Sequence, residues 1–516
     1  MRPSILAASL FLLAPAARAF QEAPLHSHDE VRVHDTGLVA NDSATRRVVA
    51  SFSVDYPGAD WLRLSFSEIT LGGDEELGTG AFLRITSMLD GASQTLHARH
   101  AREWRNTSAY FNGDALLVEL VAEPHTGPSR VRLAGLTIGD ATLQGFTQCG
   151  STDDRVLSSD PRQGRALPVG CTAWMINDCG HCFLSAGHCL AGTLDVVEFN
   201  VPLSTGSGAL QHPPPEDQYA TDPASKQSTN GGLGNDWGYF GCFANSVTNL
   251  TPFQKQHASY VLVAPPPVSS SVTVRITGYG VDSTPATYNQ VQQTSTGPFW
   301  NQFGQQLAYQ TDTEGGNSGS PVVWNQSNVA FGIHTHGGCS TSSTSYNSGT
   351  ASTNAGLQAA LASPHGICNV ACSASTWTYC TAKVNSQGCT PQITSTGAPS
   401  ASGGAGSFAI HAASMINQKT GLLLYAIQPA STPFQGGTLC LANPLVRTGV
   451  QNSGGNSGPD DCSGTYHYDM GARIGSGVDA NLHVGTTAYA QWYQRDPAST
   501  SAPVGLSAGL AFTIGP

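Results

Sequence analysis

The stretch Gly315-Gly316-Asn317-Ser318-Gly319-Ser320-Pro321-Val322-Val323 places a serine in a glycine-rich turn directly before an apolar run. A serine hydroxyl is a weak nucleophile unless a neighbouring base takes its proton. Glycines beside it let the backbone turn tightly and aim N–H groups at one point, where the oxygen of a tetrahedral intermediate gathers negative charge. We therefore expect Ser318 to be a nucleophile, with the N–H groups of Gly316 and Ser318 as its oxyanion hole. For this stretch taken alone, an ordinary loop before a strand is the alternative.

A histidine and an aspartate earlier in the chain complete the pattern. His188 follows the small-residue stretch 184–187, and Asp236 begins a short acidic-aromatic stretch. His188 precedes Asp236 by 48 residues, and Asp236 precedes Ser318 by 82. A histidine that accepts the serine proton, held by a carboxylate that fixes its tautomer, makes a catalytic triad. The order His, Asp, Ser excludes an α/β-hydrolase, which needs the order Ser, acid, His and a serine in a strand-to-helix elbow.

Together these three motifs resemble those of the chymotrypsin-like serine peptidases, particularly the bacterial glutamyl and lysyl endopeptidases. The resemblance covers about residues 149–368. Three further stretches support it, because they resemble the family's strand before the histidine, its mid-barrel strand and the strand that lines its specificity pocket: 171–174, 276–280 and 332–334.

The resemblance implies a fold, a reaction and a substrate class. The fold is all-β, with two six-stranded antiparallel barrels and the active site between them. His188 and Asp236 would come from the first barrel and Ser318 from the second. The implied reaction is the hydrolysis of protein or peptide substrates through an acyl-enzyme, with no metal and no organic cofactor.

Three residues near the serine are candidates for the substrate pocket. Asp312 matches the acidic pocket floor of trypsin-like enzymes and would favour Lys or Arg by charge complementarity. Thr313 and His334 match positions that bind the acidic side chain in glutamyl endopeptidases. An Asp-Thr pair before the glycines also occurs generally in the bacterial branch, where the aspartate would be structural. The sequence therefore leaves both preferences open.

Asn317 departs from the pattern of the animal digestive enzymes, which carry an aspartate directly before the nucleophile. In those enzymes the aspartate pairs with a newly cut N-terminus and completes the oxyanion hole. Asn317 cannot form that ion pair. We therefore expect zymogen activation, if the protein uses it, to remove an N-terminal module. Residues 20–148 stand where the pro-regions of related secreted proteases stand.

Four segments follow one another along the chain. Residues 1–19 are typical of an export signal, with a positive start, a short apolar run and a small-residue cleavage site. Residues 20–148 alternate apolar and polar side chains with period two, which predicts a β-sandwich-like domain and a candidate pro-region. Residues 149–368 form the predicted trypsin-like domain, with a short helix over 355–362 near its end. Residues 369–516 carry strand-like runs and predict a β-rich accessory domain.

Composition and charge favour a β-rich protein and argue against a nucleic-acid partner and a membrane span. Only 11% of the residues are charged, while 58 glycines and 30 prolines favour short strands joined by tight turns. The net charge of −12 is spread without a basic stripe, so nucleic acid is not an expected partner. No stretch beyond the signal approaches the roughly 20 apolar residues that a membrane helix needs. We expect an extracellular protein without a membrane span.

All 13 cysteines follow residue 148, and behind an export signal most of them should form disulfides. The family resemblance implies a bridge between Cys171 and Cys189. Cys440 and Cys462 are expected to form another. The odd number leaves at least one thiol free or paired with another chain.

Two short motifs raise the alternative of a metal site. Cys179 and Cys182 have the spacing of a zinc-binding thiolate pair. No second pair follows at the spacing of a zinc ribbon, so we expect disulfides there instead. His334 and His336 stand two residues apart on a predicted strand and could face a metal, but the pocket interpretation explains His334 better. The sequence therefore predicts no metal site.

The C-terminal domain shows no nucleophile or carboxylate pair and is expected to be a stable accessory domain. Binding to a surface or polymer is its alternative, with Trp492 and Tyr493 as the suggestive aromatics. For the whole chain, the alternative to an active peptidase is a catalytically silent, protease-like binding protein at the cell surface. The complete triad favours the enzyme.

Overall fold

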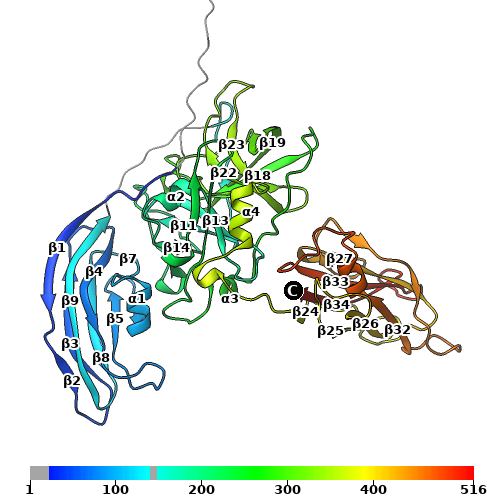
Figure 1. The fold of residues 1–516 in the computed structure, drawn as a ribbon, viewed down its shortest axis with the longest axis horizontal. Helices are drawn as coiled ribbons and strands as arrows, with labels where there is room; N and C mark the ends of the chain where they lie inside the picture. Colours follow the sequence, from blue (N-terminus) through cyan, green and yellow to red (C-terminus); the bar gives the residue numbers. More distant parts are fainter. Residues whose placement is uncertain (1–21, 140–147) are drawn as a thin grey trace, which may run out of the picture.

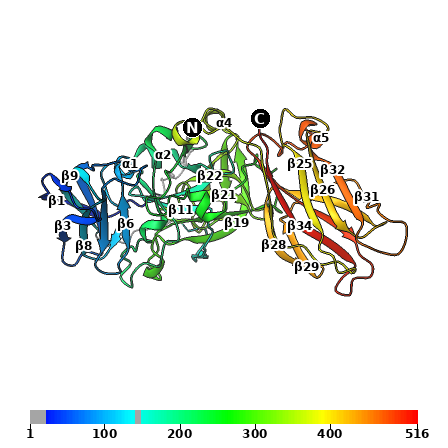
Figure 2. The same cartoon turned by 90° about the horizontal axis from the view of Figure 1, so that it is seen from below.

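The computed structural model describes residues 22–139 and 148–516. Over these ranges the chain folds into three β-rich bodies that follow one another along the molecule (Figure 1). A view at a right angle shows the same order, with the central body between the two outer ones (Figure 2). The export signal predicted at residues 1–19 lies outside the described residues.

The N-terminal body is a sandwich of two antiparallel sheets. Among the described residues one sheet contains β1 (Ser27–Asp35), β2 (Val39–Asn41), β4 (Trp61–Thr70), β7 (Phe111–Asn112) and β9 (Thr126–Gly139). The other contains β3 (Arg47–Asp55), β5 (Phe82–Ser87), β6 (Ser93–Leu96) and β8 (Ala115–Ala122), and α1 (Ala98–Glu103) follows β6. Alternate residues such as Leu64 and Val118 face the core and are fully buried. This burial explains the period-two pattern of the sequence.

The central body begins with a sheet of seven strands. They are β11 (Gln163–Leu167), β12 (Cys171–Met175), β13 (Phe183–Ser185), β14 (Val196–Glu198), β15 (Gln218–Ala220), β16 (Gln227–Asn230) and β17 (Asp236–Phe240). The short helix α2 (Gly187–Ala191) follows β13 directly, and α3 (Pro252–Gln256) follows β17. We call this sheet the first barrel. Its core is rich in fully buried side chains, including Trp174 and Phe183.

A second barrel follows along the chain. It contains β18 (Thr273–Gly278), β19 (Gln293–Phe303), β20 (Gln306–Tyr309), β21 (Pro321–Trp324), β22 (Val329–His336) and β23 (Asn347–Ala351). Pairing of β19 with β20 closes the ring, and β10 (Val156–Leu157) adds to the edge of β19. The predicted all-β, chymotrypsin-like double-barrel fold is therefore confirmed, although in the described residues the first sheet has seven strands in an open order and forms a half-barrel, whereas the second closes. The helix α4 (Ala355–Ala362) ends this body where the sequence predicts a helix.

The C-terminal body is also β-rich. Its larger sheet contains β24 (Ser375–Tyr379), β27 (Thr420–Ala426), β30 (Val446–Arg447), β31 (Gln451–Asn452), β33 (Thr487–Arg495) and β34 (Val504–Thr513). Beside it lie a smaller sheet, a hairpin and a helix: β25 (Gln392–Gly397), β26 (Phe408–Met415) and β32 (Gly464–Asp469); β28 (Pro429–Phe434) and β29 (Gly437–Leu441); and α5 (Met470–Gly475). Trp492 is fully buried and stacks on Tyr466. It belongs to the core, so the suggestion that it binds a polymer is wrong.

Six disulfides join the described cysteines. The pairs are Cys149–Cys339, Cys171–Cys189, Cys179–Cys372, Cys182–Cys368, Cys380–Cys440 and Cys389–Cys462. Cys242 is the one cysteine left as a thiol in the described ranges, and it is buried. Disulfides at this number indicate a compartment more oxidising than the cytosol. Over residues 22–139 and 148–516, no helix is long and apolar enough to cross a bilayer.

The bridge predicted between Cys440 and Cys462 is wrong. Cys440 lies on β29 and Cys380 follows β24, and both of these strands pack against β34. This packing brings Cys440 to Cys380, while Cys462 joins Cys389. Cys179 and Cys182 likewise bond to Cys372 and Cys368 and not to each other.

Candidate active site

The predicted triad residues lie on three elements that meet where the two barrels join. His188 is in α2 and Asp236 is the first residue of β17, both in the first barrel. Ser318 is in the turn that leads from the second barrel's β20 into β21. The N–H of Thr172 on β12 donates to the Ser318 carbonyl at 2.8 Å, so the turn is bonded directly to the first barrel.

His188 and Asp236 form a buried pair that is joined by two hydrogen bonds. The Asp236 carboxylate lies 2.6 Å from the ring Nδ1 through Oδ2, and its Oδ1 accepts the His188 backbone N–H at 3.0 Å. Asp236 is fully buried, and its own N–H donates to Thr350 Oγ1 at 3.1 Å. A carboxylate at Nδ1 fixes the proton there, which leaves Nε2 as the basic nitrogen of the ring. The pair can therefore accept a proton at Nε2.

Strand β22 brings the serine close to this pair. The Ser318 hydroxyl donates to the Thr335 carbonyl at 3.4 Å, and the next residue, His336, has its ring centroid 6.3 Å from that of His188. The Gly319 N–H donates to the His334 carbonyl at 2.8 Å, which fixes the turn along the same strand. Ser318 has no exposed surface. The nucleophile candidate and the base candidate thus border one short stretch of β22.

The turn before the serine depends on a glycine at position 316. Gly316 has φ of 102°, and a Cβ atom there would lie 2.2 Å from the Tyr279 carbonyl oxygen. The Gly316 carbonyl accepts the Thr172 hydroxyl at 2.9 Å, and the Asn317 side chain accepts the Glu314 N–H at 2.9 Å. These bonds hold the turn in one conformation, which a preorganised oxyanion hole requires.

Three residues that support the site are not among the predicted site residues, although two of them lie in the stretch 171–174. Thr172 bridges the two barrels, because its hydroxyl also accepts the Tyr279 N–H at 3.0 Å. The indole of Trp174 donates to the Gly319 carbonyl at 2.9 Å. Thr350 holds the backbone of Asp236 from the second barrel. Threonines in strands are common, so only their positions in the fold identify them.

The carboxylate of Asp312 points toward the chain segment that begins the central body. Its two oxygens accept the N–H of Cys149 at 2.7 Å and of Asp154 at 2.8 Å. The residue is almost fully buried, and this burial raises the pKa of Asp312 to about 6. The structure therefore places the acid in a structural clamp.

Thr313 and His334 lie in the interior of the second barrel. Thr313 Oγ1 accepts from Asn347 Nδ2 at 2.8 Å. The Tyr309 hydroxyl lies 2.6 Å from His334 Nδ1, and burial lowers the pKa of His334 to about 3. Both residues have no exposed surface. At neutral pH the ring of His334 is uncharged.

The cysteines that could bind a metal are all bonded in disulfides. Among residues 22–139 and 148–516, one group of three ligand-type side chains lies within 4.8 Å, and it consists of Cys171, His188 and Cys189. The two cysteines are bonded to each other, so they offer no thiolate. Cys179 and Cys182 are also in disulfides. These cysteines therefore do not fit a zinc site.

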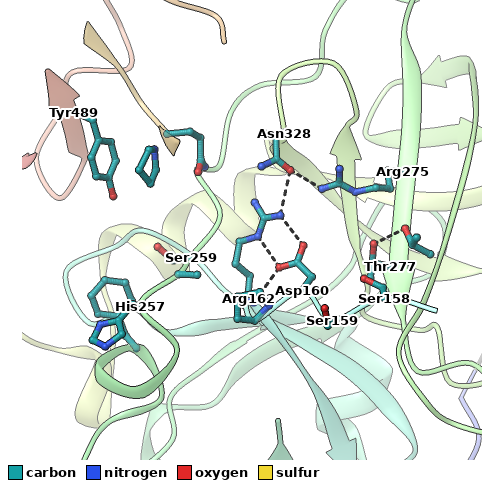
Figure 3. A pocket seen from close by; sticks show the side chains of 16 residues that line it. Ser158, Ser159, Asp160, Arg162, His257, Ser259, Arg275, Thr277, Asn328 and Tyr489 are labelled. Atoms are coloured by element: carbon teal, nitrogen blue, oxygen red, sulfur yellow. Dashed lines mark hydrogen bonds and ion pairs between the residues drawn. The ribbon is translucent and has the colours of Figure 1, made fainter. Parts of the chain in front are cut away.

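A separate pocket of about 650 Å³ lies between the central and C-terminal bodies (Figure 3). Arg162 projects into it and binds Asp160 at 2.6 Å, with its guanidinium 3.8 Å from the centre of the Tyr260 ring. Tyr489 from the C-terminal body and His257 from the central body line opposite parts of the pocket. No triad residue lines it.

Comparison with known proteins gives limited matches. No family model matches the chain. An extracellular metalloprotease of Bacillus subtilis (strain 168) is 31% identical over 200 residues, which are 36% of this chain and 55% of that protein. The chain thus spans about half the length of this curated relative.

Two solved structures align with less than half of the chain. A Glu endopeptidase in complex with MPD aligns with a TM-score of 0.30 and 18% identity, over 41% of this chain and 96% of its own. A thermostable serine protease from an extremophilic microorganism aligns with a TM-score of 0.29 and 14% identity, over 37% of this chain and 87% of its own.

Proposed function

We propose that the chain is a secreted serine endopeptidase in which Ser318, His188 and Asp236 form the triad. One observation carries the proposal: the buried Asp236 carboxylate holds His188 at 2.6 Å beside the strand that also binds the Ser318 hydroxyl. A buried carboxylate is costly unless it is paired and hydrogen-bonded. Such a pair next to a serine turn is the arrangement that proton transfer from a hydroxyl needs.

The proposed reaction is acyl transfer to water. Ser318 Oγ attacks the peptide carbonyl while His188 Nε2 takes its proton and later gives it to the leaving amine. Asp236 stabilises the charged ring, and the N–H groups of Gly316 and Ser318 bind the oxyanion. Water then attacks the acyl-enzyme with His188 as base. These steps require no metal and no organic cofactor.

The test is Ser318→Ala in the full chain. We expect peptide hydrolysis to fall by roughly 10⁶-fold, and Asp236→Asn to lower kcat by roughly 10⁴-fold because the ring would adopt the wrong tautomer. Labelling by a fluorophosphonate probe should disappear in the alanine variant. Hydrolysis that survives Ser318→Ala would remove this serine from the mechanism.

The alternative of a silent, protease-like binding protein makes the opposite prediction. The processed protein would not react with the fluorophosphonate probe, although a triad is present. The position of the His188–Asp236 pair beside the strand that binds the Ser318 hydroxyl favours the enzyme, because a binding protein needs no base next to a serine.

For the substrate, we infer a preference for an acidic side chain before the cleaved bond. The Asp312 carboxylate is occupied by two backbone N–H groups and does not offer a charge for Lys or Arg. The Tyr309 hydroxyl lies 2.6 Å from His334 Nδ1. In the tautomer in which this hydroxyl is the donor, the ring proton is on Nε2, where it would donate to a substrate carboxylate. Sequencing the cut sites in a mixed peptide library tests this. Cleavage after Glu is expected, and cleavage after Lys or Arg would overturn the inference.

A further inference from the structure

The described chain begins with an extended segment, Glu22–Leu25, that reaches from β1 of the N-terminal body to the central barrels (Figure 1). We propose that this segment, which we call the strap, is a built-in inhibitor that occupies the substrate groove beside Ser318 until it is displaced or cut. This rests on the proposed peptidase function and names a regulation of the same site.

On one side the strap pairs with the chain that leads into β12. The Ala23 N–H donates to the Gly170 carbonyl at 2.7 Å, and the Leu25 N–H donates to the Pro168 carbonyl at 2.9 Å. The Gln290 side-chain amide donates to the Ala23 carbonyl at 3.1 Å. Alternate backbone bonds of this kind are how an extended peptide adds to the edge of a sheet. The strap is therefore bound as a peptide ligand would be.

The contact between Gly170 and Ala23 requires a glycine at position 170. It has φ of 64°, and a Cβ atom there would lie 1.6 Å from the Ala23 carbonyl oxygen. Any other residue would displace the strap. The next residue, Cys171, is bonded to Cys189 beside His188, so this seat is covalently tied to the helix that carries the base candidate.

On its other side the strap touches the turn of the nucleophile. A Cβ atom on Gly315 would lie 3.1 Å from the Glu22 carbonyl oxygen and 3.7 Å from the Ala23 Cβ. Gly315 stands three residues before Ser318 and next to Gly316. The strap thus contacts both the chain at Gly170 and the loop that leads to Ser318. Ser318 itself has no exposed surface.

The N-terminal body anchors the strap against the barrels. The Tyr110 N–H donates to the Gln218 side chain at 2.9 Å, and that side chain donates back to the Tyr110 carbonyl at 2.7 Å. Asn112 and the backbone of His212 exchange bonds in the same way, at 2.9 and 2.8 Å. A tethered segment of this length acts at an effective concentration in the millimolar range. Dilute peptide substrates would therefore compete poorly with it.

The decisive experiment is a disulfide trap in the full chain, Ala23→Cys with Gly315→Cys. The Cβ separation of 3.7 Å lies in the range of about 3.5–4.5 Å that a disulfide requires. We expect the bridge to form, and the oxidised protein to react with a fluorophosphonate probe at least tenfold more slowly than the mildly reduced protein. Gly315→Cys alone is the matched control, and its rate should not change with reduction. The native thiol, Cys242, is buried.

Each outcome has a definite meaning. Failure of the two cysteines to bridge would overturn the position of the strap, whatever the activity. A bridge with equal labelling rates in both redox states would show that the strap lies nearby without blocking. A bridge without labelling in either state, together with no labelling of the strap-loosening variant Ala23→Pro, would overturn the proposed peptidase, and with it the inhibition.

A second variant tests the strap without a new cysteine. Ala23→Pro removes the N–H that binds Gly170, so it should loosen the strap and raise the labelling rate of the full chain severalfold. Pro24→Ala is the matched control, because it keeps the N–H groups of Ala23 and Leu25 and should leave the rate unchanged. Equal rates for the two variants would contradict the proposal.

Discussion

The carboxylate of Asp312 ties the first residues of the central body to the loop before the nucleophile. Both of its oxygens accept backbone N–H groups, from Cys149 and Asp154. The same segment is joined covalently to the second barrel by the bridge of Cys149 to Cys339. Two independent connections therefore hold this segment beside the candidate pocket. Such a clamp orders the pocket without a newly formed N-terminus, which fits the replacement of the usual aspartate by Asn317.

The clamp predicts a pH effect at a single residue. Burial raises the pKa of Asp312 from 3.8 to about 6, so the folded protein holds the proton more tightly than the unfolded chain. The contribution of Asp312 to stability is therefore largest below pH 3.8 and decreases as the pH rises to 6. In Asp312→Asn this decrease, about 1–3 kcal/mol, should be absent. Denaturant unfolding at pH 4 and pH 7 measures it.

A suitable control is Asp42→Asn, because Asp42 is exposed. Its pH profile should match that of the natural protein. Identical profiles for Asp312→Asn and the natural protein would contradict the burial argument. The library cleavage pattern of Asp312→Asn should also stay unchanged, since the acid is not proposed to touch substrate.

Motif chemistry was sufficient to propose the triad residues, because nucleophile, base and acid each sit in a distinctive local stretch. It was not sufficient for Asp312, where one residue type serves either as a pocket floor or as a clamp. The difference lies in which N–H groups face the carboxylate, and those come from residues about 160 positions away. The bonding roles of Thr172 and Thr350 cannot be predicted from the sequence for the same reason.

At the scale of elements, the residue that caps α4 also bonds the loop that positions Asp236. Asn354 caps the helix, since its Oδ1 accepts the N–H groups of Gly356 and Leu357 at 2.9 and 3.1 Å. Its amide group also donates to the Gly234 carbonyl at 2.9 Å, in the loop that precedes Asp236. The amide oxygen of this side chain therefore caps the helix, while its amide nitrogen holds the loop. We regard Asn354 as a positioning residue.

Two substitutions separate these roles. Asn354→Asp keeps the cap acceptor but loses the donor to Gly234, so we expect near-natural helix stability and a lower kcat with little change in KM. Asn354→Ala loses both, and should also lower the free energy of unfolding by about 1 kcal/mol. Steady-state kinetics and denaturant unfolding measure the split. Natural kcat in Asn354→Asp would show that the residue serves the helix alone.

Strands were predictable where one face is buried, because alternation of Leu64, Phe66 and their neighbours records the core directly. The helix over 355–362 was predictable from its short run of helix-forming residues. Disulfide pairing was not, because partners such as Cys179 and Cys372 are 193 residues apart and meet only through tertiary packing. Cys440 shows the same limit, since its partner depends on which strands flank β34.

At the scale of the whole molecule, the two outer bodies are attached to the barrels in different ways. The core of the N-terminal body continues into the first barrel through Leu167, Val196 and Ala220. The C-terminal body instead shares an open pocket with the barrels, between Arg162 and Tyr489 (Figure 3). Packing therefore holds the N-terminal body to the barrels more firmly than it holds the C-terminal body. The chain that leads to the C-terminal body is held by two disulfides.

These two disulfides form a double staple between the loop before β13 and the chain after α4. While Cys182–Cys368 remains, Cys179–Cys372 closes only a short additional loop, so the pair Cys179→Ser with Cys372→Ser should lower the free energy of unfolding by about 2.5 kcal/mol. Replacing all four cysteines also opens the loop of 186 residues that Cys182–Cys368 closes. This adds about 5 kcal/mol, for a total cost of about 7–8 kcal/mol. The fourfold variant should also enlarge the radius of gyration in small-angle scattering. Because none of the four residues is placed in the proposed reaction, hydrolysis of short peptides by the first variant should stay at the natural rate. Equal costs for the two variants would mean that Cys182–Cys368 adds no stability and that packing across the pocket, rather than the staple, holds the C-terminal body.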